Sequence, residues 1–345
     1  MNTKTKMLYG GLQALQRELS KDEWQDAKYT ILLDENTFQH CLPLLVSQVE
    51  NLQEAEFIEV PVGEECKCLE VAAQVWQTLL DGEADRQHVV VNLGGGAVCD
   101  LGGFVAAGYK RGIRHINVPT TLLAMVDAAI GGKTAVDFGG VKNSIGHFYP
   151  ASLTVIETTF LDSLPETETT NGLMEMVKTA AVTDPKLFNE LMVDTDTSHL
   201  SPVTCHLKQV ARIKSRVVKA DPYDHSIRKI LNFGHTFGHA IELHSGTPHG
   251  IAVGIGMLAA MYLSHHKLGL PESTYTAYRQ WLAQHVEIPH YTLKDTEKML
   301  PLMRQDKKNT TGSLRCVLLQ EPGAPVIDVE VSDNEVRDTL LRLGR

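Results

Sequence analysis

Hydrophobic residues in the first half of the chain occur in short runs separated by amphipathic stretches. Runs rich in β-branched residues predict strands at Tyr29–Leu33, Phe57–Val60, Val89–Leu93, Ile116–Val118 and Thr154–Ile156. Between them, Cys66–Asp81 and Leu122–Ala129 space their apolar residues as helices do. This alternation predicts a parallel sheet flanked by helices.

After about Pro165 the pattern changes, because strand-like runs nearly disappear. Helical periodicity predicts helices at Thr169–Val182, Pro202–Val218, Ile227–His244, Ile251–Leu268 and Glu272–Gln284. One late run, Arg315–Leu319, predicts an isolated strand. A chain of 345 residues fits two domains of ordinary size. We therefore expect a Rossmann-like α/β domain over residues 1–162 and a mostly α-helical domain over residues 163–345.

The composition is that of an ordinary globular protein, with 43% hydrophobic and 21% charged residues. The formal net charge of -10 argues against a general nucleic-acid binder, which needs a basic surface to neutralise phosphates. The N-terminus lacks the apolar core of a signal peptide. The longest apolar stretch, Ile251–Leu263, is shorter than the roughly 20 residues that cross a bilayer. These features favour a cytoplasmic protein without a membrane partner.

A glycine cluster follows the predicted strand Val89–Leu93. Gly94, Gly95 and Gly96 lead into Ala97–Ala107, which has the pattern of a helix. A strand, a tight glycine turn and a helix aim backbone N–H groups at a bound anion, and a dinucleotide pyrophosphate is the natural candidate. The spacing GGGxxxD differs from the usual GxGxxG, and a plain turn explains such a cluster equally well.

Polar residues follow two other predicted strands, at Asp34–Asn36 and at Glu64–Lys67. Ribose and adenine contacts often come from such positions. Solvated loops explain these residues equally well on the pattern alone.

Histidines mark the helical half of the chain. His235 and His239 lie four residues apart, so on a helix they project from one face, and His249 follows a turn and opens the next helix. Far upstream, Glu175 precedes Lys178 by about one helical turn. Two imidazoles and a carboxylate suit a catalytic Zn²⁺ or a similar divalent ion. A pair of helical histidines by itself is more often part of the core or the surface.

Two glycines, Gly234 and Gly238, flank these histidines. Glycine inside a helix costs on the order of 1 kcal/mol relative to alanine. It also permits a close approach of backbone or ligand, so the pair favours a binding role for the segment.

Basic residues stand beside glycine, asparagine or acidic residues in otherwise apolar segments. They are Lys133, Lys142, Lys178, Lys214, Arg228, Lys307 and Lys308. Each alone is best explained as a solvated surface charge. Together they could hold a phosphate and a carboxylate, with arginine favouring a bidentate contact and lysine a point charge.

Many separate motifs, in one order along the chain, resemble those of the 3-dehydroquinate synthase family. The resemblance runs from about residue 30 to residue 320. It rests on Gly94–Asp100, Val118–Leu123, Val126–Asp127, Gly131–Ala135, Lys142–Asn143, Gly172–Lys178, Leu231–Ala240, Pro248–Gly250 and Arg304–Lys308. So many motifs in the same order are not expected by chance.

The resemblance implies a role for each matched residue. The implied metal ligands are Glu175, His235 and His249. The implied NAD contacts are Asp34, Asn36, Glu64, Lys67, Gly95, Gly96, Asp100, Thr120, Thr121, Asp127, Lys133, Lys142, Phe160 and Ser163. The implied substrate contacts are Asp127, Lys133, Asn143, Lys178, Lys214, Arg228, Asn232, His239 and either Lys307 or Lys308. Arg111 is implied to reach the site of a neighbouring subunit, and the chain is therefore expected to form a homodimer.

The resemblance also implies a reaction and its cofactors, NAD and a divalent metal ion, Zn²⁺ or Co²⁺. 3-Deoxy-D-arabino-heptulosonate 7-phosphate becomes 3-dehydroquinate and phosphate, a step of the shikimate pathway. NAD⁺ oxidises a secondary alcohol, phosphate leaves by β-elimination, and NADH returns the hydride before the ring opens and an aldol closure forms the carbocycle. His239, one helical turn from an implied ligand, is placed to relay a proton near neutral pH.

Three positions depart from the family pattern. Ile251 stands where an acidic residue usually follows the His-Gly pair, so no support for the metal site is expected from that position. Asp224 stands where a longer glutamate is usual, and Ser163 replaces a threonine near the cofactor. None of the three is an implied metal ligand.

Three alternatives stay open on the sequence. A related sugar-phosphate cyclase would act on a substrate without a carboxylate, which Lys214 and Arg228 disfavour. A metal-dependent polyol dehydrogenase of similar fold would release NADH, and Glu175 disfavours it because that class usually presents an aspartate-led metal set. A non-catalytic binding protein would lack some ligands or cofactor contacts.

Overall fold

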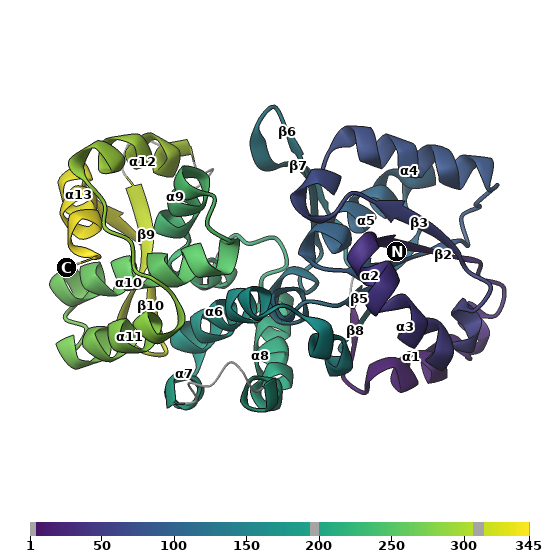
Figure 1. The fold of residues 1–345 in the computed structure, drawn as a ribbon, viewed down its shortest axis with the longest axis horizontal. Coiled ribbons are helices and arrows are strands. Elements are labelled where there is room, and N and C mark those ends of the chain that lie inside the picture. The colour runs from purple at the N-terminus through teal and green to yellow at the C-terminus, as the bar shows by residue number, and fades with distance from the viewer. Residues whose placement is uncertain (1–4, 194–199, 306–313, 345) are drawn as a thin grey trace. The chain divides into compact units, whose positions relative to one another are not determined.

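The computed structural model describes residues 5–193, 200–305 and 314–344 (Figure 1). The chain divides into two compact units, Met1–Pro165 and Glu166–Arg345. The first holds a parallel sheet with helices around it, and the second is built mainly of helices. The α/β-plus-helical fold class predicted from the sequence is therefore confirmed.

Six parallel strands form the sheet of the first unit, in the spatial order β1-β8-β5-β4-β2-β3. In chain order they are β1 (Lys6–Leu8), β2 (Tyr29–Asp34), β3 (Glu56–Val60), β4 (Val89–Gly94), β5 (Arg114–Pro119) and β8 (Leu153–Val155). The five strands predicted from β-branched runs are all present, with small shifts at their ends. The sequence did not reveal β1, because its three residues are too few to show a pattern.

The central strands β2 and β4 are buried along their whole length. A strand covered on both faces consists of a continuous apolar run, which is why these two were evident in the sequence. Figure 1 shows helices on both sides of the sheet. The α-helices are α1 (Gly11–Leu19), α2 (Glu35–His40), α3 (Leu42–Gln48), α4 (Leu69–Asp81) and α5 (Gly96–Gly108). Short 3₁₀ turns are η1 (Asp22–Trp24), η2 (Glu50–Leu52), η3 (Gly63–Cys66), η4 (Tyr109–Arg111) and η6 (Thr158–Ser163).

Two features of the first unit differ from the sequence prediction. The segment predicted as a helix over Leu122–Ala129 contains a π-helix, η5 (Ala124–Ala128), in which Ala129 N donates to Ala124 O. Strands β6 (Lys133–Phe138) and β7 (Val141–Phe148) form an antiparallel hairpin that was not predicted. Their two-residue Gly-Gly turn has positive φ at both positions, a common hairpin signal that the sequence did contain.

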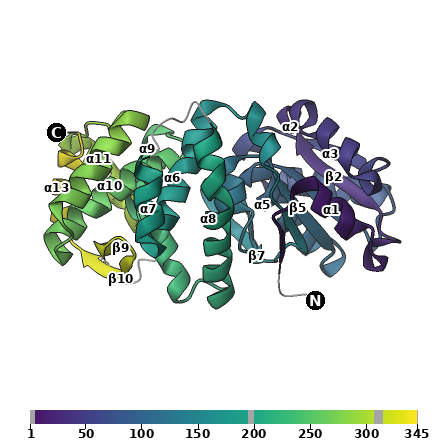
Figure 2. The ribbon, with the colours of Figure 1, turned by 90° about the horizontal axis from the view of Figure 1, so that it is seen from below.

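The second unit contains eight α-helices among its described residues. They are α6 (Glu166–Thr183), α7 (Pro185–Val193), α8 (Leu200–Ala220), α9 (His235–Ser245), α10 (His249–Leu268), α11 (Glu272–His285), α12 (Leu293–Gln305) and α13 (Asp333–Arg342). Figures 1 and 2 show α6, α7 and α8 side by side. Helix α10 is buried nearly all round and forms the centre of this unit.

Two predictions for the second unit were wrong. Ile227–His244 is not one helix: a 3₁₀ turn, η7 (Ile227–Asn232), is separated from α9 by Gly234, whose φ of +79° ends helical geometry. The strand predicted as isolated at Arg315–Leu319 is β9 (Leu314–Glu321), which pairs antiparallel with β10 (Ala324–Val331). The partner strand was missed because Pro325, its second residue, is unfavourable inside a strand.

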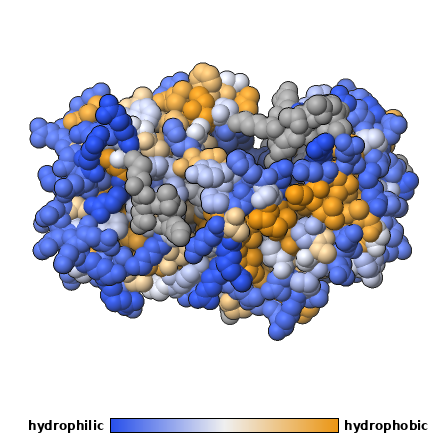
Figure 3. All heavy atoms as spheres, turned by 180° about the vertical axis from the view of Figure 1, so that it is seen from behind, coloured by the Kyte–Doolittle hydropathy of each residue, from blue (hydrophilic) through white to orange (hydrophobic). Residues whose placement is uncertain are grey.

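Hydrophilic residues cover most of the face drawn in Figure 3, and hydrophobic residues gather there in separate patches. Within the ranges that the structure describes, no helix has both the length and the apolar character needed to cross a membrane. Both observations agree with the composition of the chain.

Candidate metal centre and cofactor loop

Three histidines of the second unit come together at the start of two neighbouring helices. His235 and His239 lie on α9, with ring centroids 5.2 Å apart. His249 opens α10, and its ring centroid is 5.4 Å from that of His235 and 5.7 Å from that of His239. One ring nitrogen of each lies within 4.8 Å of the others. The cluster therefore includes His239 as well as the two histidines implied as ligands.

Glycines let α9 and α10 approach closely enough to form this cluster. A Cβ on Gly238 would lie 2.9 Å from Val253 Cα, and a Cβ on Gly256 would lie 2.1 Å from the carbonyl oxygen of Gly234. Real side chains do not tolerate such contacts with backbone. The close backbone approach predicted for the glycines around the histidines is thus confirmed, and it fixes where the imidazoles point.

Glu175 of α6 is fully buried beside the histidines. Its Oε1 lies 3.8 Å from His235 Nε2 and 3.7 Å from His249 Nε2, while its Oε2 lies 2.5 Å from Lys178 Nζ. Bonds of about 2.0–2.2 Å around a tetrahedral ion put ligand atoms roughly 3.4 Å apart. The distances from Glu175 Oε1 to the two Nε2 atoms are therefore close to those between ligands of one ion.

The contacts of the Nδ1 atoms show which ring nitrogens of His235 and His249 are free of a proton and face Glu175. His235 Nδ1 lies 3.2 Å from the carbonyl oxygen of Phe233, and His249 Nδ1 lies 2.9 Å from Glu242 Oε2. Both partners are acceptors, so each neutral ring carries its proton on Nδ1 and a lone pair on Nε2. Two lone pairs then face Glu175 Oε1, a buried oxygen to which no group of the described chain donates a hydrogen bond. A cation at this point would satisfy all three atoms.

Glu242 was not identified from the sequence. It lies on α9, three residues after His239, and its contact with His249 is the kind that orients a metal-binding imidazole. The sequence signal was present, since Glu242 shares the helix of the histidine pair, but its direction depends on where α10 begins. Ile251 contributes no carboxylate, and this support comes from α9 instead.

Three cations of the second unit that the resemblance implies as substrate contacts are buried. Lys178 is 1% exposed, Lys214 6% and Arg228 5%. The explanation of these three as solvated surface charges is therefore wrong. Asn232 is half-buried at the end of η7. Lys307 and Lys308 lie outside the described residues.

A loop with a buried aspartate carries Arg228. Asp221 accepts hydrogen bonds from the backbone N–H groups of His225, Ser226 and Arg228, at 3.0, 2.6 and 3.1 Å. Burial would raise the pKa of Asp221, but these hydrogen bonds outweigh it and lower the pKa to about 2. Arg228 Nη1 also donates to the Pro222 carbonyl at 2.8 Å. The loop is held by its own backbone, including Asp224 at a φ of +61°.

The candidate cofactor residues of the first unit follow the carboxyl ends of parallel strands. In a parallel sheet these ends share one edge, and ligands bind there at the point where the strand order reverses. The order reverses between β2 and β4, because β3 lies beyond β2 and β5 beyond β4. Asp34 is the last residue of β2, and the segments after β2, β3, β4, β5 and β8 contain Asn36, Glu64, Lys67, Gly95, Gly96, Thr120, Thr121, Phe160 and Ser163.

The glycine loop after β4 leaves the start of α5 open. Gly95 precedes α5, and no side chain caps the helix there. A Cβ on Gly94 would lie 2.5 Å from Val98 Cβ, and Thr120 N donates to Gly94 O at 3.0 Å. Thr121 packs against Gly95, 3.2 Å from where a Cβ would stand. The uncapped N–H groups of α5 are suited to a phosphate oxygen.

Lys67 contacts three other candidate residues. Its Nζ lies 3.0 Å from Asp100 Oδ2, 3.6 Å from Glu64 Oε2 and 2.7 Å from Asn143 Oδ1. The side chain is only 4% exposed, and burial alone would lower the pKa of Lys67. The carboxylates of Asp100 and Glu64 outweigh burial and raise that pKa above its ordinary value. Lys67 is therefore a fixed positive charge.

The remaining candidate residues of the first unit differ in how far they are buried. Asp34 is mostly buried and caps α2, accepting from Thr37 N at 2.9 Å, while Asn36 is exposed. Phe160 is buried, and its carbonyl accepts from Ser163 Oγ at 3.3 Å. Asp127 is half-buried on η5. Exposed positions are those of Lys133 and Lys142 on the hairpin and of Arg111, whose φ is +68°.

Comparison with known families matches both units of the chain. The model of the 3-dehydroquinate synthase N-terminal domain matches residues 57–171, and that of the C-terminal domain matches residues 172–309. A 3-dehydroquinate synthase of Parabacteroides distasonis is 37% identical over 319 residues, which covers 91% of this chain and 90% of the relative. The two family models and this relative point to one family.

Solved structures of similar fold agree with this family. A 2-deoxy-scyllo-inosose synthase, crystallised with carbaglucose-6-phosphate, NAD⁺ and Co²⁺, superposes with a TM-score of 0.87 at 25% identity, covering 97% of this chain and 96% of that one. ValA, a 2-epi-5-epi-valiolone synthase of Streptomyces hygroscopicus with NAD⁺ and Zn²⁺ bound, gives 0.86 at 25% identity, covering 99% and 96%. On the matches over both units, the chain belongs to the 3-dehydroquinate synthase family.

Proposed function

We propose that this protein is a 3-dehydroquinate synthase, which converts 3-deoxy-D-arabino-heptulosonate 7-phosphate to 3-dehydroquinate and phosphate. The single observation that carries the proposal is the buried Glu175 carboxylate, whose Oε1 faces the lone pairs of His235 and His249. Such a set of donors suits a catalytic divalent ion with an open position. Family membership then supplies the reaction.

Glu175, His235 and His249 would hold the metal ion, Zn²⁺ or Co²⁺. Bound there, the ion would act as a Lewis acid toward a substrate oxygen. Glu242 would keep the His249 ring oriented through its contact with Nδ1. Lys178, paired with Glu175 and almost fully buried, would place its own ammonium group beside the metal ligands.

The first unit would hold NAD by its glycine loop. The uncapped N–H groups of α5 would take the pyrophosphate, with Gly95 and Gly96 allowing the close approach. Asp34, Glu64 and Lys67 would contact the nucleoside end. NAD, when bound, would accept a hydride from the substrate and return it later in the cycle. The further contacts proposed are Asn36, Asp100, Thr120, Thr121, Asp127, Lys133, Lys142, Phe160 and Ser163.

Cationic and amide side chains would bind the two acidic groups of the substrate. Arg228 would take the carboxylate, since its guanidinium matches a planar anion, and lysine ammonium groups would take the phosphate as point charges. Stabilising the leaving phosphate lowers the barrier to its elimination. His239 would carry a proton between substrate and solvent through its imidazole. The residues proposed for the substrate are Asp127, Lys133, Asn143, Lys178, Lys214, Arg228, Asn232, His239 and Lys307 or Lys308.

Phosphate release with substoichiometric NAD tests the proposal. Purified protein with the heptulosonate phosphate should release many phosphates per NAD, lose this activity with a chelator and regain it with Zn²⁺ or Co²⁺. A polyol dehydrogenase would instead accumulate NADH in proportion to product. A cyclase for neutral sugars would release phosphate from sedoheptulose 7-phosphate and not from the acid. Neither alternative is favoured by the relatives, which carry the 3-dehydroquinate synthase name.

Two further expectations belong to this proposal. The family resemblance supports a homodimer in which Arg111 reaches the partner's site, and the exposure of Arg111 is compatible with that role. Sedimentation equilibrium would show a dimer, and Arg111→Ala would lower turnover without changing metal affinity. A cytoplasmic location of the protein is proposed on the same basis. Cell fractionation with a tagged chain tests this location.

A further inference from the structure

A row of polar side chains crosses the middle of the parallel sheet in the first unit. Asn92 on β4, Asn117 on β5 and Thr154 on β8 are neighbours in strand register. Their exposures are 0%, 6% and 0%, so all three lie where apolar side chains usually form the core. Residues in register on adjacent strands point to the same face, and the three therefore form one continuous polar row.

The hydrogen bonds of this polar row have a fixed direction. Asn92 Nδ2 donates to Asn117 Oδ1 at 2.8 Å, and Asn117 Nδ2 donates to the carbonyl oxygen of Ala129 at 3.4 Å. Thr154 Oγ1 donates to the same carbonyl at 3.3 Å. Because a carbonyl oxygen only accepts, Asn117 must turn its NH₂ to Ala129 and its oxygen to Asn92. The row therefore ends on one backbone atom, held from two strands.

That backbone atom belongs to Ala129, the residue directly after the π-helix η5. Ala129 N donates to Ala124 O at 3.1 Å, and Ile130 N donates to Asp127 O at 3.0 Å. The glycine loop packs directly on η5, since a Cβ on Gly96 would stand 3.1 Å from Ala128 Cβ. Holding the Ala129 carbonyl thus holds η5 under the loop that begins α5.

The polar row is not explained by stability alone. Asn92 Oδ1 is fully buried and accepts no hydrogen bond from the described residues. Its space exists only because position 102 is glycine, where a Cβ would stand 1.8 Å from Asn92 Oδ1. A buried unsatisfied oxygen destabilises a fold, and apolar residues of similar shape would avoid it. π-Helical turns are frequent at functional sites, which points to a role in placing η5.

We propose that Asn92, Asn117 and Thr154 are positioning residues that fix η5 against the glycine loop and thereby set the affinity of the first unit for its dinucleotide. The proposal rests on the proposed function in one respect, that NAD is the ligand of this loop. The residues act through the Ala129 carbonyl and do not touch the cofactor.

Two near-isosteric variants test the role of the polar row. Thr154→Val removes one donor to Ala129, and Asn117→Leu removes the other and the bond to Asn92. Thr30→Val is the matched control: Thr30 is 2% exposed on β2 of the same sheet, and its hydroxyl bonds His88 Nε2 at 2.8 Å, away from η5. For each protein we would measure the NAD dissociation constant by calorimetry, unfolding in urea, and hydrogen exchange of residues 124–130 without NAD.

Thr154→Val and Asn117→Leu each remove one hydrogen bond to the Ala129 carbonyl and should weaken NAD binding by about tenfold, the fold-change expected for one such buried bond. The amides of Ala129 and Ile130 should exchange faster in both, while Thr30→Val keeps wild-type affinity and exchange at a similar loss of stability. NAD affinity and exchange that match the control in both variants would overturn the proposal. If the unsubstituted protein binds no NAD, the proposed function fails, and the exchange of residues 124–130 alone decides whether the row holds η5.

Discussion

Oε2 of Glu242 lies 2.9 Å from Nδ1 of His249, on the side of the ring away from Glu175. A carboxylate in this position fixes the tautomer and raises the basicity of the imidazole, so that Nε2 is the better metal ligand. Glu242→Ala should therefore weaken Zn²⁺ or Co²⁺ binding by about 10- to 100-fold. Glu242→Gln keeps an accepting oxygen, so its metal affinity should lie between that of the unsubstituted protein and that of Glu242→Ala. Competition against a chromophoric chelator measures these affinities.

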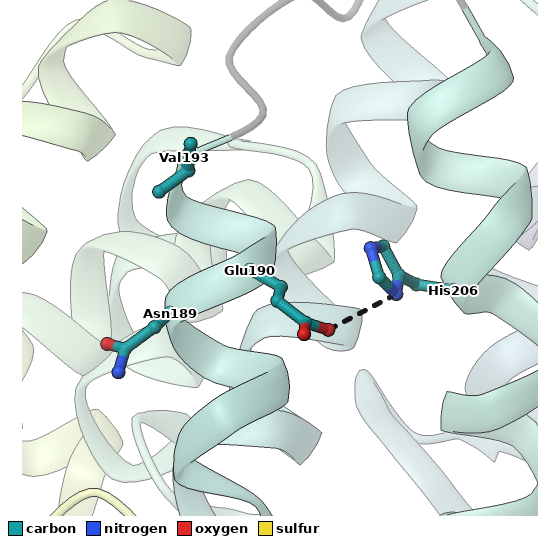
Figure 4. Close-up of a pocket in the computed structure, with 4 residues that line it drawn as sticks. All are labelled: Asn189, Glu190, Val193 and His206. Carbon is teal, nitrogen blue, oxygen red and sulfur yellow. Dashed lines mark ion pairs between the residues drawn. The ribbon is translucent and has the colours of Figure 1, made fainter.

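The control for Glu242 is Glu190, which lies 3.9 Å from His206 across α7 and α8 (Figure 4). This pair has the same residue types and lies on other helices than the histidine cluster. Glu190→Ala should leave metal affinity unchanged. Equal affinities for Glu242→Ala and Glu190→Ala would contradict the orienting role of Glu242.

Removing the metal should destabilise the second unit. Glu175 Oε1 would then face two imidazole lone pairs without a cation, and a buried oxygen that accepts no hydrogen bond is costly. Free metal at 100 times its dissociation constant should add about 2.7 kcal/mol to the free energy of unfolding. Thermal unfolding with added Zn²⁺ and with chelator measures this gain. His235→Ala should show no gain, and a gain of equal size in that variant would place the ion elsewhere.

His239 lies in the histidine cluster, and two roles for it can be separated. As a proton carrier it should matter for turnover: His239→Ala should lower kcat by about 10²- to 10⁴-fold and change metal affinity less than tenfold. As a ligand it should matter for metal affinity, with a loss similar to that of His235→Ala. Steady-state kinetics and metal competition on the same preparations distinguish the roles. Unchanged turnover in His239→Ala would remove the proton-carrying role.

The sequence predicted those strands and helices that are buried on all faces. β2 and β4 are buried on both faces, so their apolar runs were unambiguous, and α10 was found because it is apolar nearly all round. The β6–β7 hairpin was missed because its strands are partly exposed and lack a clean alternation. The break at Gly234 was missed because helical periodicity continues through it, while the close packing on Met257 and Val253 that requires the break is a tertiary contact.

The sequence predicted only those site residues whose type and local spacing indicate a binding role. Histidines four apart and a glycine cluster after a strand both carry a local signal. The burial of Lys178, Lys214 and Arg228 does not, since a lysine or arginine in sequence is normally a surface charge. Glu242 and the polar row of Asn92, Asn117 and Thr154 depend on contacts between distant segments, which no local pattern specifies.

His115 should make the stability of the first unit depend on pH. It is 1% exposed on β5, stacked on Tyr149 with ring centroids 5.5 Å apart, and burial lowers the pKa of His115 to about 4. The unfolded chain has the ordinary value near 6.5, so between pH 6.5 and 4 the unfolded state binds a proton that the folded state does not. Stability is therefore full above pH 6.5 and falls as the pH drops, by about 2 kcal/mol at pH 5.

His115→Phe keeps the ring stacking and removes this titration. Urea unfolding at pH 7 and pH 5 should show a smaller loss of stability on acidification for His115→Phe than for the unsubstituted protein. Part of the loss should remain, because burial also lowers the pKa of His88. His147→Phe, at an exposed position of the same unit, is the control and should keep the full loss. If His115→Phe and His147→Phe lose the same free energy between pH 7 and pH 5, His115 is not the buried neutral group that its surroundings require.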